Sequence, residues 1–325
     1  MRGTVVGVLR GGPSREHEVS LRSGHAVMNA LPRERYTVRD IFIDKEGVWH
    51  ERGIKTNPAT VLPSIDVAVI ALHGEYGEDG EVQKVLERFG IPYTGSDSFA
   101  SFVAMHKVMA KEKARGAGLQ VPRYTFIEHE EDAEPMVHEV IRTYPQPVIV
   151  KAPRWGSSVG VTAPAGYQPV HQAVTGLLNE GAGGALIEEF IRGTEASVGV
   201  LENIRGEELY ALPAVEIVPP AHESFFTYDA KYSGQSQEIA PGRFSKSVMN
   251  ELQEYAKRMH QELGLRHYSR SDFIVSPKGI FYLETNTLPG LTAGSLLPKG
   301  LASVGINLTQ FLEHVIALAM ESRKR

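Results

Sequence analysis

The chain has 325 residues, and 34 Lys and Arg stand against 39 Asp and Glu, which gives a formal net charge of −5 at pH 7. This balance argues against a nucleic-acid partner bound through a basic face. The absence of cysteine excludes disulfides, thiolate nucleophiles and Cys-ligated zinc or iron–sulfur sites.

The length suits two or three domains of roughly 100 to 150 residues each. The longest apolar run, residues 67–72, is too short to cross a bilayer. The first residues, MRGTVVGVLRGG, lack the apolar core of a signal peptide. We therefore expect a cytoplasmic protein that contacts no membrane.

The first third of the chain alternates apolar strands with helical segments. Two polar, glycine-rich loops, GGPSREHEVS and LHGEYGEDG, follow the first and third strands. This order predicts a parallel α/β sheet, and ligands bind beyond the carboxyl ends of such strands. The expected strands are residues 5–9, 36–43 and 65–72, and the expected helices are residues 19–31 and 81–89.

Each of the two loops offers one candidate side chain and also has a simpler explanation. Glu16 near a helix N-terminus would help to hold an amino-acid zwitterion, whereas a turn capped by Ser14 explains the same residues. His73 would hydrogen-bond a substrate, whereas Asp79 as a helix cap and the glycines as turn formers suffice for its loop. A dinucleotide-dependent oxidoreductase is a weaker alternative, because Asp40 suits a ribose but GxGxxG is absent.

A second α/β unit is predicted after Gly95. A helix at residues 98–116 carries Lys107, and a strand at residues 148–151 ends in Lys151. The loop that follows, APRWGSSVG, exposes backbone N–H donors that can fold over phosphates. A plain hairpin loop is the alternative.

The segment ALIEEFIRGTE, residues 185–195, is an apolar strand that breaks into acids and then a glycine. Its backbone edge could bind a purine and its carboxylates could bind ribose hydroxyls. By itself, the segment is more typical of an ordinary strand and turn.

Two short runs, residues 269–275 and 280–284, flank Ser-Pro-Lys-Gly and predict a β-hairpin. A three-residue loop with Gly279 in the left-handed conformation would pair Ser276 with Ile280. This register sets four polar side chains opposite one another in two pairs, Asp272 with Glu284 and Arg270 with Asn286.

The four polar side chains would share one face of the hairpin, because side chains alternate between the faces of a strand. Two opposed carboxylates repel each other unless a cation lies between them. Two acids and an amide suit Mg²⁺ better than zinc. A solvated amphipathic hairpin is the alternative. The opposite, apolar face would carry Phe273, Val275, Phe281 and Leu283.

Taken in order, these motifs resemble those of the D-alanine:D-alanine ligase family in the ATP-grasp superfamily. The match runs from GGPSREHEVSL through LHGEYGEDG, GSSVG, EEFIRGTE, YDAKY and SRSDF to LETNTLPGLTAGSLLP. The resemblance implies an α/β fold with α+β elements. A Rossmann-like parallel domain, residues 1–96, would precede a two-part ATP-grasp fold, with a central subdomain at 97–184 and a C-terminal subdomain at 185–325.

The resemblance implies ATP-dependent ligation of two D-alanine molecules through an acylphosphate, for peptidoglycan synthesis and hence cell-wall biogenesis and cell shape. It also implies two Mg²⁺ or Mn²⁺ ions and a homodimer. One alternative is an ATP-grasp ligase that takes D-lactate as its second substrate, which the YDAKY motif with Tyr232 disfavours. Another is a non-catalytic nucleotide-binding relative, although such a relative would be expected to lose the metal ligands.

Site residues follow from the resemblance by position. Asp272, Glu284 and Asn286 would ligate the metal ions, and Arg270 with the Gly290 backbone N–H would stabilise an oxyanion. The expected ATP-binding residues are Lys107, Lys151, Gly156, Ser157, Ser158, Glu188, Glu189, Ile191, Glu195 and Lys231. The expected amino-acid site comprises Glu16, Ser157 and Tyr232 in one network, His73 beside the first D-alanine, and Ser295 and Leu296 at the carboxylate of the second.

Residues 225–242, long and polar, would form a lid over the site. Four positions depart from the family pattern: His106 replaces an Asp, Trp155 replaces a Glu, Ala152 separates Lys151 from Pro153, and His267 replaces a glycine. None of the four removes a charged group that the site needs.

Overall fold

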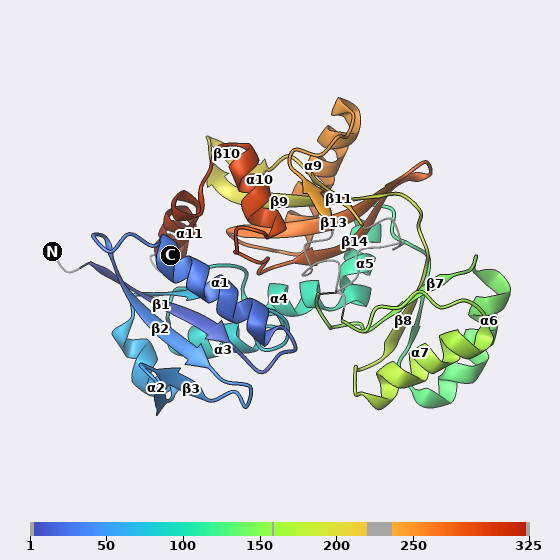
Figure 1. The fold of residues 1–325 in the computed structure, drawn as a ribbon, viewed down its shortest axis with the longest axis horizontal. Coiled ribbons are helices and arrows are strands. Elements are labelled where there is room, and N and C mark those ends of the chain that lie inside the picture. Colours follow the sequence, from blue (N-terminus) through green and yellow to red (C-terminus); the bar gives the residue numbers. More distant parts are fainter. Residues whose placement is uncertain (1–2, 158, 220–235, 323–325) are drawn as a thin grey trace.

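The computed structural model describes residues 3–157, 159–219 and 236–322. Three sheets form three lobes, and the C-terminal sheet lies between the N-terminal and central lobes (Figure 1). The expected α/β architecture is confirmed, and the lobes differ in how their strands run.

The N-terminal sheet has the strand order β4-β3-β2-β1-β5, and β1, β2 and β5 are parallel as predicted. β2 has the predicted bounds, whereas β5 is shorter than the expected 65–72. An antiparallel ribbon, β3 and β4, was not predicted, because its strands are only three residues long. The bounds are β1 Thr4–Gly11, α1 His17–Ala30, β2 Tyr36–Ile43, β3 Trp49–Glu51, β4 Ile54–Thr56, α2 Pro58–Val61, β5 Val67–Ile70 and α3 Glu81–Arg88.

The central lobe is a three-stranded antiparallel sheet in the order β6-β8-β7, covered by α6 and α7 (Figure 1). The subdomain boundary expected after residue 184 is wrong by sheet membership, because β8 is the middle strand of this sheet. The bounds are β6 Tyr124–Ile127, α6 Ala133–Thr143, β7 Val148–Lys151, α7 Tyr167–Asn179 and β8 Ala185–Glu189.

The C-terminal sheet has the order β12-β11-β9-β13-β14, with β10 paired to β9. Its bounds are β9 Thr194–Ile204, β10 Glu207–Ala211, β11 Val215–Val218, β12 Gln237–Ile239, β13 Tyr268–Ser276 and β14 Gly279–Asn286. The helices that follow or precede its strands in the chain are α4 Ser98–Met105, α5 Lys107–Gly116, α9 Lys246–Glu262, α10 Leu296–Ser303 and α11 Leu308–Ser322.

Two helices, α4 and α5, replace the single helix expected at residues 98–116. His106 has extended backbone angles, φ −82° and ψ 99°, and the N–H of Lys107 donates to the Pro153 carbonyl at 2.9 Å. Both helices pack against β14, and their buried alanines share a core with the C-terminal sheet. By packing, therefore, they belong with the C-terminal sheet and not with the central lobe, where they were expected.

The β13–β14 hairpin pairs Asp272 with Glu284 and Arg270 with Asn286, as predicted. Its tip is wrong in the prediction: Ser276 pairs with Gly279, so only Pro277 and Lys278 form the loop. A β-bulge at Asp272/Phe273, with Leu283 as the extra residue, offsets this one-residue shift, so Asp272 still pairs with Glu284.

The bulge also changes the faces of the hairpin. Ile280 and Tyr282 join Phe273 in the buried core, whereas Leu283 lines a pocket and Phe281 is only half-buried. The expected apolar face of Phe273, Val275, Phe281 and Leu283 is therefore wrong on β14, where Ile280 and Tyr282 take the places expected for Phe281 and Leu283.

The C-terminal helix α11 returns to the N-terminal lobe. It packs against α1 and β5, and its residues Phe311 and Leu312 share one apolar core with β1. Within the described ranges no single helix is long and apolar enough to cross a bilayer. Only α10 and α11 taken together have that length and apolar content, and the two helices are bent by 102° relative to each other.

Candidate active site

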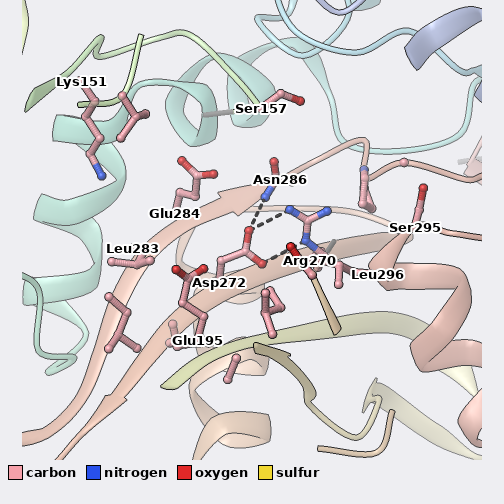
Figure 2. Close-up of a pocket in the computed structure, with 18 of the residues that line it drawn as sticks. Lys151, Ser157, Glu195, Arg270, Asp272, Leu283, Glu284, Asn286, Ser295 and Leu296 are labelled. Atoms are coloured by element: carbon pink, nitrogen blue, oxygen red, sulfur yellow. Dashed lines mark hydrogen bonds and ion pairs between the residues drawn. The ribbon is translucent and has the colours of Figure 1, made fainter. Parts of the chain in front are cut away.

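A pocket of about 740 Å³ lies where the three lobes meet. Figure 2 shows side chains from the β13–β14 hairpin, the glycine loop after β7 and the start of α10 around one space. The structure brings together most of the residues expected from the sequence: Glu16, His73, Lys107, Lys151, Ser157, Glu188, Glu189, Ile191, Glu195, Arg270, Asp272, Glu284, Asn286, Gly290, Ser295 and Leu296 all line this pocket.

Three of the expected residues, Ser158, Lys231 and Tyr232, lie outside the described residues, as does most of the expected lid at 225–242. Gly156 is described but does not line the pocket. A Cβ on Gly156 would lie 2.3 Å from Oε2 of Glu16, so a glycine at this position allows the loop to approach that carboxylate.

One end of the pocket gathers lysines. Glu188 binds two of them with its two carboxylate oxygens, Lys111 at 3.0 Å and Lys151 at 3.0 Å. Burial alone would raise the pKa of the Glu188 carboxyl, but the two ammonium groups outweigh it and the pKa is lowered. Burial lowers the pKa of the fully buried Lys111 to about 8.

Lys107 extends this basic group toward the hairpin. Its ammonium donates to the Trp155 carbonyl at 2.6 Å and lies 3.4 Å from Oε2 of Glu284. Because Lys107 is the first residue of α5, the helix break at His106 helps to point this side chain at the glycine loop. The basic end of the pocket is therefore connected to both the loop and the hairpin, and it suits a polyanion.

The other end of the pocket gathers acids. Glu16 accepts a hydrogen bond from the Ser157 hydroxyl, which joins the N-terminal loop to the glycine loop. The N-cap residue of α1 is Glu16 and not Ser14; the Ser14 hydroxyl accepts from the Glu16 N–H at 3.1 Å and donates to the His73 carbonyl at 2.6 Å. Glu78, which the sequence analysis did not select, also lines this end and is 7% exposed.

The Glu78 carboxylate accepts hydrogen bonds from the backbone N–H groups of Gly74 at 2.9 Å and Leu288 at 3.2 Å. Burial, and then the nearby charge of Glu16, raise the pKa of the Glu78 carboxyl. Two acids that interact electrostatically favour a cation near them. An ammonium group suits this end of the pocket.

His73 is buried beside these acids, and both of its ring nitrogens are used. Nδ1 lies 2.8 Å from the Leu288 carbonyl, which can only accept, so Nδ1 carries the proton and Nε2 accepts from the Ser23 hydroxyl at 2.7 Å. Burial lowers the pKa of the His73 imidazole to about 4, so the ring is neutral at pH 7. In this arrangement His73 supports the loop that leads to Gly290, and it offers no nitrogen to a substrate.

Arg270 and Asp272 connect the two ends. The Arg270 guanidinium donates to both oxygens of Asp272, at 3.0 and 2.8 Å, and Asn286 donates its amide to the same carboxylate at 3.1 Å (Figure 2). Burial opposes the charge of Arg270, but the attraction of Asp272 outweighs it and the pKa of Arg270 is raised. A protonated guanidinium, paired with the Asp272 carboxylate, therefore lies at the centre of the pocket.

The oxygen donors of Asp272, Glu284 and Asn286 face this same space, and the Asn286 amide oxygen lies on the side away from Asp272 (Figure 2). A set of two carboxylates and one amide fits Mg²⁺ or Mn²⁺. No group of three or more His, Cys, Asp or Glu side chains suited to a metal occurs among the residues that the structure describes. Two ions would therefore need Asn286 and oxygens from a substrate as further ligands.

A third part of the pocket wall is the start of α10, which begins after Ser295. A Cβ on Gly290 would lie 2.7 Å from the Ser295 hydroxyl, so the Gly290 turn fits closely against the helix start. The Ser295 hydroxyl also lies 2.9 Å from that of Thr292. Free N–H groups at this helix start, including that of Leu296, can bind a carboxylate.

Two departures from the family pattern make contacts in the structure, and a third lies at a helix break. The Trp155 ring lies under the guanidinium of Arg15, 3.9 Å from the ring centroid, so a second contact joins the N-terminal loop to the glycine loop. His267 has φ +66°, the left-handed conformation that explains the usual glycine, and its Nδ1 accepts from the Gly95 N–H at 3.1 Å. His106 marks the helix break.

Sequence reasoning missed two charged residues at the site, Lys111 and Glu78. Lys111 lies four residues after Lys107 and between the buried alanines Ala110 and Ala114, and a lysine on an apolar helix face is a usable signal. Glu78 belongs to the LHGEYGEDG loop that was selected for His73, but three acids of that loop looked alike in the sequence.

Two facing sheets, a lysine-lined cleft between them and a preceding parallel α/β lobe define an ATP-grasp ligase. Family profiles described as D-ala D-ala ligase N-terminus and C-terminus match residues 5–60 and 50–96, and residues 114–317, respectively. The chain belongs to the D-alanine–D-alanine ligase family.

Relatives and solved structures agree with this assignment. A D-alanine–D-alanine ligase of Syntrophobacter fumaroxidans is 42% identical, and the match covers 97% of each chain; one of Carboxydothermus hydrogenoformans is 37% identical, over 98% of this chain and 99% of the relative. The ligase of Bacillus anthracis complexed with ATP superposes with a TM-score of 0.81 at 26% identity and covers 99% of each chain. The VanG D-Ala:D-Ser ligase of Enterococcus faecalis has a TM-score of 0.83 at 28% identity, over 98% of this chain and 100% of its own.

Proposed function

We propose that this chain is an ADP-forming ligase that uses ATP to join two molecules of D-alanine into D-alanyl-D-alanine for peptidoglycan synthesis. The observation that carries the proposal is the opposite charge at the two ends of one pocket. Lysines gather at one end and a pair of acids at the other, and Arg270 with Asp272 lies between them. ATP and an amino acid would meet at this centre.

The chemistry explains why the ends must meet. A carboxylate is a poor acyl donor because its leaving group would be oxide, so the first D-alanine must first accept the γ-phosphoryl group of ATP. The amine of the second D-alanine then attacks the acylphosphate and displaces phosphate, which forms the amide bond. We assign Lys107, Lys151 and the backbone of the glycine loop to the phosphates of ATP.

We assign the adenosine to the segment that joins β8 to β9, with Glu189 and Ile191 offering backbone groups and Glu195 a carboxylate. Their place on the pocket wall supports this assignment. Glu188 was also expected to bind adenosine. Since both of its oxygens bind lysines, we assign to it mainly the positioning of Lys151.

We assign Glu16 to the ammonium of the first D-alanine, in contact with Ser157. The carboxylate of the second D-alanine would bind at the start of α10, at Ser295 and Leu296. Arg270 and the N–H of Gly290 would stabilise the oxyanion formed when the second amine attacks. His73 would hold the loop before Gly290 in place.

Asp272, Glu284 and Asn286 would hold two Mg²⁺ or Mn²⁺ ions, with oxygens of the substrates as further ligands. Such ions, when bound, neutralise the charge that develops on the phosphates during transfer. The all-oxygen donor set of this hairpin face supports the assignment. We further propose a cytoplasmic location, since ATP is available there, and a homodimer, on the strength of the family resemblance alone.

The decisive experiment measures phosphate release by the purified protein with ATP and Mg²⁺ against D-alanine, L-alanine, D-lactate and D-serine. Mass spectrometry would identify each product. We expect D-alanyl-D-alanine and phosphate release that depends on D-alanine. ATP hydrolysis without amino-acid dependence, or none, would instead indicate the non-catalytic nucleotide-binding alternative.

The second-substrate alternative has one observation in its favour, the fold similarity to a D-Ala:D-Ser ligase. Incubating the protein with D-alanine mixed with D-serine or D-lactate at several pH values, and identifying the products, would show whether a mixed product forms in competition with D-alanyl-D-alanine. We expect D-alanyl-D-alanine to dominate, and a dominant mixed product would reassign the second substrate.

A further inference from the structure

Lys111 is a charged side chain that is fully buried, 0% exposed, next to the candidate site but outside the pocket lining. It lies on α5, a helix that packs against both β14 and α9. A buried ammonium is costly unless it is paired and hydrogen-bonded. Its partners therefore indicate what it does.

The first partner is Glu188 on β8 of the central sheet, at 3.0 Å. The second oxygen of Glu188 binds Lys151, also at 3.0 Å. Two ammonium groups and one carboxylate leave a net positive charge at Lys151, which lines the pocket. Without Lys111, Glu188 would neutralise Lys151 and would be free to turn away from its present position.

The second partner is the carbonyl of Leu283 on β14 of the C-terminal sheet, at 3.1 Å. Leu283 is the extra residue of the β-bulge, where the regular ladder is interrupted. Its side chain lines the pocket (Figure 2), and the next residue is Glu284, which faces Asp272. Lys111 thus holds the backbone at the point where the bulge sets the direction of Glu284.

We infer that Lys111 is a positioning residue for nucleotide binding: its ammonium ties the central sheet, through Glu188, to the bulge of the C-terminal sheet at Leu283, and so sets the two walls between which ATP binds. The inference rests on the proposed function, because it assumes that the lysine-lined end of the pocket takes ATP. Lys111 itself would touch no substrate, since it does not line the pocket. Its loss affects the ATP end of the pocket and spares the end that holds D-alanine.

The test replaces Lys111 with Met, which keeps the length of the side chain and removes its charge. Lys113→Met is the matched control, because Lys113 lies two residues further along α5 and is exposed. We expect Lys111→Met to raise the KM for ATP about ten- to hundredfold, the effect of losing one charge-assisted hydrogen bond. The KM for D-alanine should change less than about twofold, and Lys113→Met should match the unmodified protein.

Calorimetric titration of each variant with ATP and Mg²⁺, without D-alanine, gives a readout that does not depend on turnover. Lys111→Gln is the second variant: its amide can still donate to Glu188 and to the Leu283 carbonyl, but it carries no charge to offset that of Glu188, so ATP binding should still weaken. It should weaken ATP binding less than Lys111→Met does. If the Met variant does not fold, the Gln variant decides, and unchanged ATP binding by it overturns the inference.

A double-mutant cycle separates positioning from general damage to the fold. Glu188→Gln combined with Lys111→Met should weaken ATP binding by less than the sum of the two single effects, because the variants share the route through Lys151 while Lys111 also acts through Leu283. Additive losses, or equal increases in the KM values for ATP and D-alanine, would overturn the inference. If the unmodified protein neither binds ATP nor releases phosphate, the proposed function fails; if it does both and Lys111→Met is normal, only the present inference fails.

Discussion

Glu188 and Glu78 are the same residue type, are both almost fully buried and line the same pocket, yet their pKa values move in opposite directions. Two lysines lower the pKa of Glu188, whereas burial and the neighbouring Glu16 raise that of Glu78. The difference teaches that burial alone does not decide the charge of a carboxyl group in this site, because burial raises the pKa of both groups and only Glu188 has lysines that outweigh it. The neighbouring groups decide it, and they prepare one end for phosphates and the other for an ammonium.

The variant that should break this arrangement most severely is Arg270→Ala, because Arg270 lies between the two ends. Removing an oxyanion donor of this kind costs on the order of 3 kcal/mol, or about a hundredfold in turnover. The KM for ATP should change little. Steady-state kinetics with Arg88→Ala, an exposed arginine on α3, as the control would measure this. Near-normal turnover with normal ATP binding would reject the oxyanion role.

The next largest effect should come from Glu16→Gln, which removes one charge from the acidic end. We expect the KM for the first D-alanine to rise about tenfold or more, since a charged hydrogen bond to its ammonium is lost, while the KM for ATP stays the same. Glu18→Gln, two residues further along on the exposed side of α1, is the matched control. A parallel rise in the KM for ATP would mean that the two ends are not independent.

A smaller effect should follow from Trp155→Ala, which removes the ring beneath Arg15. A cation–π contact at such a half-exposed position is worth about 0.5–1 kcal/mol. We therefore expect an increase of about two- to fivefold in the KM for ATP, because the contact helps to hold the loop whose carbonyl binds Lys107. Trp155→Glu should restore the attraction to Arg15 and give a smaller increase. Equal increases for Ala and Glu would argue against the Arg15 contact.

The smallest effect concerns stability and pH. The pKa of Glu78 is higher in the folded protein than its ordinary value of 4.5, so the folded state keeps a proton that the unfolded state releases. The stability that this group contributes is complete below about pH 4.5 and is lost as pH rises through the folded pKa. Glu78→Gln should therefore reduce the fall of the melting temperature between about pH 5 and 8, by a few degrees at most.

Glu16→Gln gives a cross-check on the same melting curves. It removes the nearby charge that helps to raise the pKa of Glu78, so it should also flatten the pH dependence, in part. If neither variant alters the slope, Glu78 is ionised in the folded protein and the comparison with Glu188 does not hold.

The sequence predicted what depends on local pattern and order. The parallel strands of the N-terminal lobe followed from their apolar runs, and the pairing of Asp272 with Glu284 followed from the hairpin. The predicted pairing at the tip of that hairpin was wrong by one residue. The pairing of Asp272 was still right, because the bulge at Leu283 shifts the register back by one residue. No local signal reveals this bulge, because its stabilising contact comes from Lys111, 172 residues away in the chain.

Tertiary contacts account for the other errors. The helix break at His106 contains neither proline nor glycine, and it depends on a hydrogen bond from Lys107 to Pro153. The boundary that the resemblance implied after residue 184 separates β8 from β6 and β7, although β8 is the middle strand of their sheet. Lys111 belongs to no motif, and its position on an apolar helix face is the only sign of its role in the sequence.

The return of α11 to the N-terminal lobe has a consequence for synthesis of the chain on the ribosome. The core around β1 includes Tyr93 but also Phe311 and Val315, so it is incomplete until the last helix has emerged. At about 5–20 residues per second, the first lobe waits on the order of ten seconds or longer for those residues. During that interval the apolar residues of β1 lack the part of their core that α11 supplies.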